Sequence, residues 1–185
     1  MSDRDLLPDE RAAPQPAGPQ PLEPAELEER LSLHRDWLAT KGAEGQRADL
    51  SRALLPDAYL QGADLRGANL SQASLQGAEL QNADLYRADL SQANLGGASL
   101  HKARLAEARL EGAHLMGAIL QSADLRRANL QRVDLRDADL LEAVLAEADL
   151  RGAFCAGTNF FLADLRRANC QEAILRQADL QGGDL

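Results

Sequence analysis

The amino-acid sequence predicts an all-β solenoid preceded by a single helix. Three observations carry this prediction. From residue 48 to the last residue, a small residue, nearly always Ala, is followed two positions later by an apolar residue, nearly always Leu, and the pair returns every fifth residue without a gap. Aromatic residues make up only 3% of the chain, so the core must consist of small and medium aliphatic side chains. A second period of twenty residues overlies the first, and internal repetition of this kind is typical of solenoids.

Residues 1–22 are expected to form a disordered tail. The segment is rich in Pro, Ala, Gln and charged residues, and it shows no apolar period. Its start is not basic overall and has no apolar stretch like that of a secretory signal, and the chain has no apolar run of about 18 residues. Two cysteines without a framework pattern fit a reducing compartment. We therefore expect a cytoplasmic protein without a membrane segment.

Residues 23–47 are expected to form a capping helix and a linker. Apolar residues and one His recur at helical spacing over residues 24–40, with Trp37 beside them: Leu27, Leu31, His34 and Leu38. Gly42 and Gly45 follow and are expected to end the helix. The residues expected to cover the first coil of the solenoid are Leu27, Leu31, Trp37 and Leu38.

Neither a helix nor a flat strand buries a period of five. Five residues turn about 500° on an α-helix, so successive Leu residues would form no stripe. On a strand, side chains alternate, and an odd period would send successive Leu residues to opposite faces. A coil that turns a corner once per pentad buries both Ala and Leu. The central positions run from Leu50 to Leu185 and number 28, and all are Leu except Cys155, Phe160 and Cys170.

The period of twenty predicts a square coil of four pentads. Opposite charges alternate at this interval in one column: Arg87, Glu107, Arg127, Glu147 and Arg167. Stacked coils bring these opposite charges together, whereas a like-charged column would repel. Four pentads per coil make seven coils out of 28 pentads, and the repeat domain spans residues 48–185.

The repeat A-(D/N)-L-x-x over residues 48–185 resembles that of the pentapeptide repeat family. The resemblance implies a right-handed quadrilateral β-helix with four pentads per coil. The stretch LSLHRDWL, Leu31 to Leu38, resembles the N-terminal cap of some bacterial members. One subset of the family resembles duplex DNA in size and charge and binds type II topoisomerases, protecting them from quinolones or from a producer's own toxin. Other members are effectors or scaffolds.

Charge argues against direct binding to nucleic acid, because the chain has a net charge of −9. Under the twenty-residue coil, one side of the rod is the most acidic, and another carries equal numbers of acids and bases with seven arginines. The acidic side is the candidate surface for a protein partner, and its carboxylates are Glu79, Asp139, Glu142 and Asp179.

Outward positions near the C-terminus are unexpectedly apolar. The residues concerned are Leu141, Phe154, Phe161, Leu162 and Ile174. Exposed apolar clusters usually mark an interface. We expect a homodimer formed through the C-terminal coils, with a different protein partner or local packing without any partner as the alternatives.

The sequence shows no pattern for catalysis, for a cofactor or for a metal. His34, His101 and His114 fall on different elements or sides without ligand spacing, and Cys155 and Cys170 occupy inward positions typical of buried hydrophobic residues. No nucleophile elbow or phosphate-binding loop occurs. The chain is therefore expected not to be an enzyme.

The sequence leaves two functions open. The specific hypothesis is a DNA-mimicking binder that protects DNA gyrase or topoisomerase IV from an inhibitor, as in antibiotic self-resistance. The dispersed charge speaks against it, since a convincing mimic of a duplex would be more acidic. The alternative is a structural or adaptor scaffold that presents its regular sides to a protein partner.

Overall fold

The computed structural model describes residues 20–184. The predicted disordered tail thus lies outside the described residues as far as residue 19. Its end differs from the prediction, because Gln20–Pro21 form strand β1, which pairs in parallel with strand β2, Ala53–Leu54. A strand of two residues has no period, so the sequence contained no signal for it.

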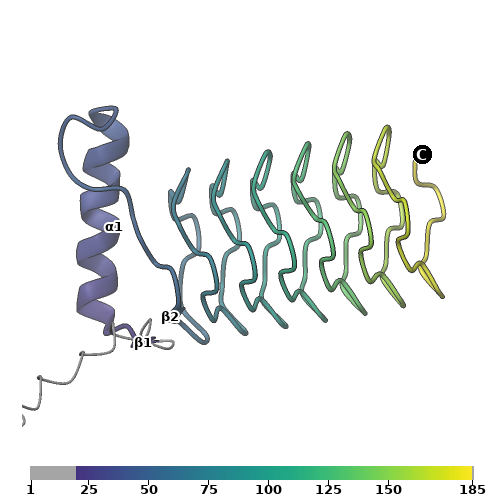
Figure 1. The fold of residues 1–185 in the computed structure, drawn as a ribbon, viewed down its shortest axis with the longest axis horizontal. Helices are drawn as coiled ribbons and strands as arrows, with labels where there is room; N and C mark the ends of the chain where they lie inside the picture. Colours follow the sequence, from purple (N-terminus) through teal and green to yellow (C-terminus); the bar gives the residue numbers. More distant parts are fainter. Residues whose placement is uncertain (1–19, 185) are drawn as a thin grey trace, which may run out of the picture.

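Helix α1, Pro24–Ala39, stands at the N-terminal end of the repeat domain (Figure 1). It begins with a Pro in the first turn, where a missing backbone N–H costs no helical hydrogen bond. It ends at Ala39 and is capped by Thr40, whose N–H bonds to the Asp36 carbonyl oxygen at 3.0 Å. The linker then folds back on the helix at Gly45, where a Cβ would lie 2.2 Å from the Leu33 carbonyl oxygen, so a side chain cannot be accommodated.

The repeat domain is a stack of coils in which each outward residue before a central position pairs with the residue twenty positions later. Parallel bridges run without interruption from Asp49↔Asn69 to Asp164↔Asp184. The predicted coil of four pentads is confirmed by this register. Figure 1 shows the coils side by side in a row, with α1 beside the first coil. Among residues 20–184, β1 and β2 are the strands, and all other pairing consists of single bridges.

Each pentad combines one bridge with one corner. The N–H of central Leu110 bonds to the next coil, at the Asn129 carbonyl oxygen (2.7 Å), and the Ala113 N–H closes the corner on the Leu110 carbonyl oxygen (3.0 Å). The second residue after every central position, from Arg52 to Gly182, has a positive φ. This left-handed conformation costs an ordinary residue about 1 kcal/mol or more, which explains the many Gly residues at this position.

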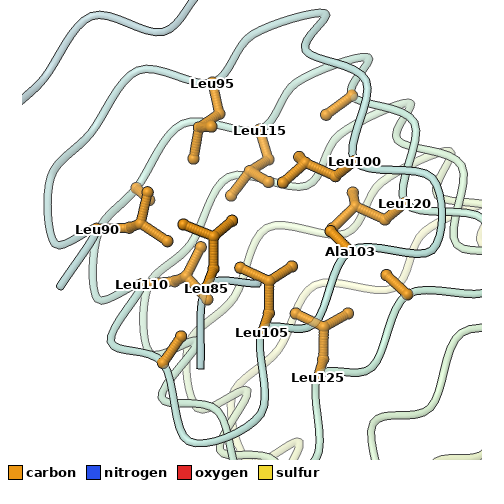
Figure 2. Close-up of a cluster of buried hydrophobic side chains, with 14 of the residues drawn as sticks. Leu85, Leu90, Leu95, Leu100, Ala103, Leu105, Leu110, Leu115, Leu120 and Leu125 are labelled. Atoms are coloured by element: carbon orange, nitrogen blue, oxygen red, sulfur yellow. The ribbon is translucent and has the colours of Figure 1, made fainter. Parts of the chain in front are cut away.

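The core consists of the central residues and the small residues two positions before them. Figure 2 shows Leu85, Leu90, Leu95 and Leu100, one from each side, pointing into a common interior. All four side chains are fully buried. Full burial of one such side chain contributes about 1.5–3 kcal/mol before the entropy cost is counted.

The three central residues that are not Leu lie close together. Cys155, Phe160 and Cys170 line the same cavity at the C-terminal end of the core. Phe is larger than Leu and Cys is smaller, so the side-chain volumes in this part of the core differ from those of the coils with four central Leu residues.

Candidate protein-binding surfaces

The pentad decides which side chains face outward. The central residue and the one two before it point inward, which leaves three outward positions in each pentad. We name the four sides of the rod after their first central residues: the Leu50 side, the Leu55 side, the Leu60 side and the Leu65 side. Residues on one side recur every twenty positions and form columns along the rod.

The Asp or Asn before a central residue is engaged in its own turn. Asp89 Oδ1 accepts the backbone N–H of Ser91 at 3.0 Å, and Asn129 Oδ1 accepts that of Gln131 at 3.1 Å. Short side chains with an oxygen at this reach form Asx turns. This role explains why Asp or Asn recurs directly before the central residue of the repeat. The sequence alone did not reveal the role. Many carboxylates of the rod therefore serve the turn as well as the surface.

The Leu65 side is a ladder of ion pairs. Within single pentads, N–O distances are 2.6–2.7 Å in Asp64–Arg66, Asp124–Arg126 and Asp164–Arg166. Between coils, the predicted column of alternating charge forms the pairs Arg87–Glu107 (2.7 Å) and Arg127–Glu147 (2.9 Å). The hydrogen bond from Arg166 lowers the pKa of Asp164 to about 2. Charge on this side is thus neutralised within the chain.

The predicted acidic surface on the Leu60 side is interrupted. Its outward column runs Tyr59, Glu79, Ser99, Ile119, Asp139, Asn159 and Asp179. Neutral residues therefore separate each carboxylate of the column from the next. Asp139 also accepts hydrogen bonds from Gln121 Nε2 (2.6 Å) and Asn159 Nδ2 (2.9 Å). Glu142 lies on the same side at a corner, and Ser122 Oγ approaches its carboxylate at 3.4 Å.

The apolar residues near the C-terminus occupy two adjacent sides. On the Leu55 side, Phe154 is 45% exposed and stacks on Ile174 in the next coil. On the Leu60 side, Phe161 and Leu162 are exposed, whereas Leu141 is half-buried. Together these five residues form two apolar clusters, one on each side.

The C-terminal end of the stack leaves the core partly open. Cys170, Leu175 and Leu180 are half-buried, although the same positions in the middle coils are fully buried. A cavity of about 160 Å³ lies among these side chains and Phe160. Burial raises the pKa of the Cys155 thiol to about 12, which makes this cysteine a hydrophobic core residue at neutral pH.

The N-terminal end of the stack faces α1. Leu31 is buried in the core, and Leu27 packs against it. Trp37 and Leu38 are half-buried. Of the four predicted capping residues, the structure therefore places two in the core or against it.

His34 contributes to this end in a way that its place in the helical stripe did not reveal. The side chain is buried, and its Nδ1 accepts the backbone N–H of Ala48 at 3.1 Å. The ring stacks on Trp37, with centroids 5.6 Å apart. Burial lowers the pKa of His34, while the Asp64 carboxylate and the Arg66 backbone oppose the shift.

Arg30 is a second polar side chain of α1 that bonds to the backbone of the first coil. Arg30 donates to the Asp49 carbonyl oxygen at 2.5 Å. Together with His34, it satisfies backbone groups at the start of the first coil.

Clusters of metal-ligating side chains and membrane-spanning helices were both sought in the described part of the chain. Within residues 20–184, no group of three or more His, Cys, Asp or Glu side chains could hold a metal ion. None of the described helices is long and apolar enough to cross a membrane.

The stacked twenty-residue coils, with a packed interior and regular outward columns, define a solenoid of pentapeptide repeats. The chain belongs to the pentapeptide repeat family, whose model matches eight copies over residues 48–92, 83–121, 93–132, 128–167 and 143–182. This confirms the family resemblance inferred from the repeat.

Solved structures of pentapeptide repeat proteins resemble the chain to different degrees. HetL from the cyanobacterium Nostoc sp. strain PCC 7120, which is involved in heterocyst differentiation regulation, is 34% identical over 74% of this chain and 80% of that chain, with a TM-score of 0.48. QnrB1, a plasmid-mediated fluoroquinolone resistance protein, is 21% identical over 72% of this chain and 82% of that chain, with a TM-score of 0.30. A protein of the Arabidopsis thaliana thylakoid lumen is 31% identical over 57% of this chain and 67% of that chain, with a TM-score of 0.29. No curated protein matches the chain.

Proposed function

We propose that the chain is a non-enzymatic, cytoplasmic adaptor: a right-handed quadrilateral β-helix that binds a protein partner through its sides. The contrast between the Leu65 side and the two apolar clusters carries this proposal. Ion pairs within the chain neutralise the Leu65 side, whereas Phe154, Phe161 and Leu162 are exposed without such pairing. Desolvating exposed apolar side chains favours association, while exposed ion pairs contribute little.

The test is partner capture by the purified full chain, with variants that change one cluster at a time. Phe154→Lys and Phe161→Lys should each abolish capture if the cluster they belong to contacts the partner. Met116→Lys is the matched control, because Met116 is 51% exposed in the middle of the Leu55 side, away from both clusters. Equal capture by all four proteins would contradict the proposal.

We further propose a homodimer formed through the C-terminal coils. The half-buried Leu175 and Leu180 and the apolar cavity beside them support it, because a second copy would cover this surface. Light scattering should give twice the monomer mass for the wild-type chain and the monomer mass for Leu180→Lys. A wild-type monomer at high concentration would overturn this proposal.

Protection of a type II topoisomerase is the second candidate function. The net charge of −9 and the acidic Leu60 side support it. The neutral residues between its carboxylates weaken it. DNA gyrase supercoiling in the presence of a fluoroquinolone should recover when the purified chain is added.

The neutralised quadruple variant Glu79→Gln, Asp139→Asn, Glu142→Gln and Asp179→Asn should lose this protection. A control that neutralises four carboxylates on the Leu50 and Leu55 sides, at Glu111, Glu172, Asp57 and Asp137, should retain it. If the folded wild-type chain leaves both supercoiling and drug-induced cleavage unchanged, gyrase is not the partner, and topoisomerase IV is tested in the same assay.

A further inference from the structure

The first coil presents a backbone edge that is covered on only some of its sides. β1 pairs with the Leu55 side, and Arg30 and His34 bond to Asp49 and Ala48 on the Leu50 side. The Leu60 side differs. Further along this side, the outward residue donates its N–H to the coil before, as Glu79 does to the Ala58 carbonyl oxygen at 2.9 Å. The N–H of Tyr59 has no backbone partner within residues 20–184.

An apolar groove opens beside this edge. Its volume is about 410 Å³, and it lies between the start of α1 and the corner that joins the Leu55 and Leu60 sides. The side chains that make it apolar are Leu22, Leu27, Leu54, Leu55, Pro56 and Tyr59. Tyr59 is 82% exposed, the most of any large hydrophobic side chain in the described part of the chain. Figure 1 shows β1, β2 and the start of α1 close together at this place.

The charge of the groove has a single sign. Glu28 and Asp57 line it, and no basic residue is among the described residues that do. This distinguishes the groove from the Leu65 side, where a cavity lined by Arg104, Arg126 and Arg127 holds as many acids as bases.

We propose that the groove binds an extended segment of another protein, added as a strand next to Tyr59. Three features support this occupant. The same edge already accepts an added strand, because β1 pairs with β2 in parallel, and the new strand would continue that pairing on the next side. The apolar lining fits one apolar side chain of the segment. The two carboxylates fit a Lys or Arg that follows or precedes it.

The probe is a fluorescein-labelled peptide in which valine and threonine alternate, with one lysine at its end. The full chain is titrated with it, and binding is followed by anisotropy and by backbone amide NMR shifts. Shift changes should centre on Tyr59 and Leu22 and leave Ile119, which lies in the same column three coils later, unchanged. The same peptide with glutamate in place of lysine should bind more weakly, by about threefold or more.

Variants separate the contributions of the Tyr59 ring and of the groove's negative charge to peptide binding. Tyr59→Ala should weaken binding by about fivefold to tenfold, because aromatic side chains dominate apolar contacts. Asp57→Lys should weaken binding of the lysine peptide and strengthen that of the glutamate peptide. Glu29→Lys makes the same charge change on α1 outside the groove and should alter neither. Unchanged thermal unfolding of each variant shows that the fold is intact.

Three outcomes would overturn the proposal. The first is the absence of shift changes at Tyr59 up to millimolar peptide. The second is an equal effect of Glu29→Lys and Asp57→Lys, which would reduce the charge preference to a general property of the surface. The third is a gain of more than about tenfold in affinity when residues 2–19 are deleted, which would make the chain's own N-terminal segment the occupant.

Discussion

The two ends of the stack differ in how the core of the terminal coil is covered. At the N-terminal end, α1 and β1 meet the first coil: Leu31 enters the core, and His34 and Arg30 bond to backbone groups. At the C-terminal end, the last described coil leaves Leu175 and Leu180 half-buried around an apolar cavity. The difference shows that the central residues of a coil become fully buried only when another coil or a cap packs against each of its two faces.

The largest expected effect comes from replacing a central Leu by Ala, and its size should depend on how deeply that Leu is buried. Leu110→Ala in the fully buried middle of the rod should reduce the free energy of unfolding by about 3 kcal/mol or more. In dilute monomer, Leu175→Ala in the half-buried last coil should reduce it by about 1 kcal/mol, since less surface is lost. Urea unfolding followed by circular dichroism measures both. Equal losses would mean that the C-terminal end is covered in solution, as the proposed dimer requires.

The cap itself should respond to pH. Because burial lowers the pKa of His34 in the folded chain, the unfolded chain takes up this proton first. The stability that neutral His34 provides is fully present above its unfolded pKa of about 6.5 and falls as the pH drops below it. Asp64, Arg66 and Arg47 are the charged groups that act on the ring.

As the pH falls below about 6.5, the free energy of unfolding should therefore decline more steeply in the wild type than in His34→Gln. Glutamine does not titrate but still offers an acceptor for the Ala48 N–H. Fluorescence of Trp37, the single tryptophan, reports on the stacked ring. Parallel declines in the two proteins would show that other groups cause the pH dependence.

The smallest expected effect concerns the corners, which are alike in the middle and near the C-terminal end. Gly117→Ala should destabilise by about 1 kcal/mol, because its φ is +67° and the added Cβ meets open space, so only backbone strain remains. Leu162→Gly should stabilise by a similar or smaller amount, because Leu162 has a φ of 58° and is exposed. Thermal unfolding of the pair compares the two corners. A stabilised Gly117→Ala would contradict the assignment of strain to this position.

Periodicity explains how much of this fold could be predicted. The period of five separates inward from outward residues, and the period of twenty gives the coil and the pairs Arg87–Glu107 and Arg127–Glu147. Both predictions rest on repetition, because the same residue pattern in every pentad supports the same structure for every pentad. The pairing of opposite charges in one column was likewise predictable because the interval between them equals one coil.

Features that occur once could not be predicted in the same way. β1 has two residues and no pattern, and the bond from the Ala48 N–H to His34 depends on how α1 packs, which the helical stripe does not specify. The groove at Tyr59 arises from two segments separated in sequence, residues 22–28 and 54–59. The Asx turns are a different case: they recur along the rod, but the Asp or Asn of the repeat is equally compatible with a solvated surface until the N–H it accepts is known.

The register of twenty also affects how such a chain can change over evolutionary time. Because each outward residue of a bridge is paired with the one twenty positions later, the gain or loss of twenty codons within the repeat moves every following residue onto an equivalent neighbour. The rod then lengthens or shortens by one step of about 4.8 Å without a new loop or a repacked core. The number of codons in this region therefore sets the length of the rod. The distance between the groove at one end and the apolar clusters near the other changes only by whole coils.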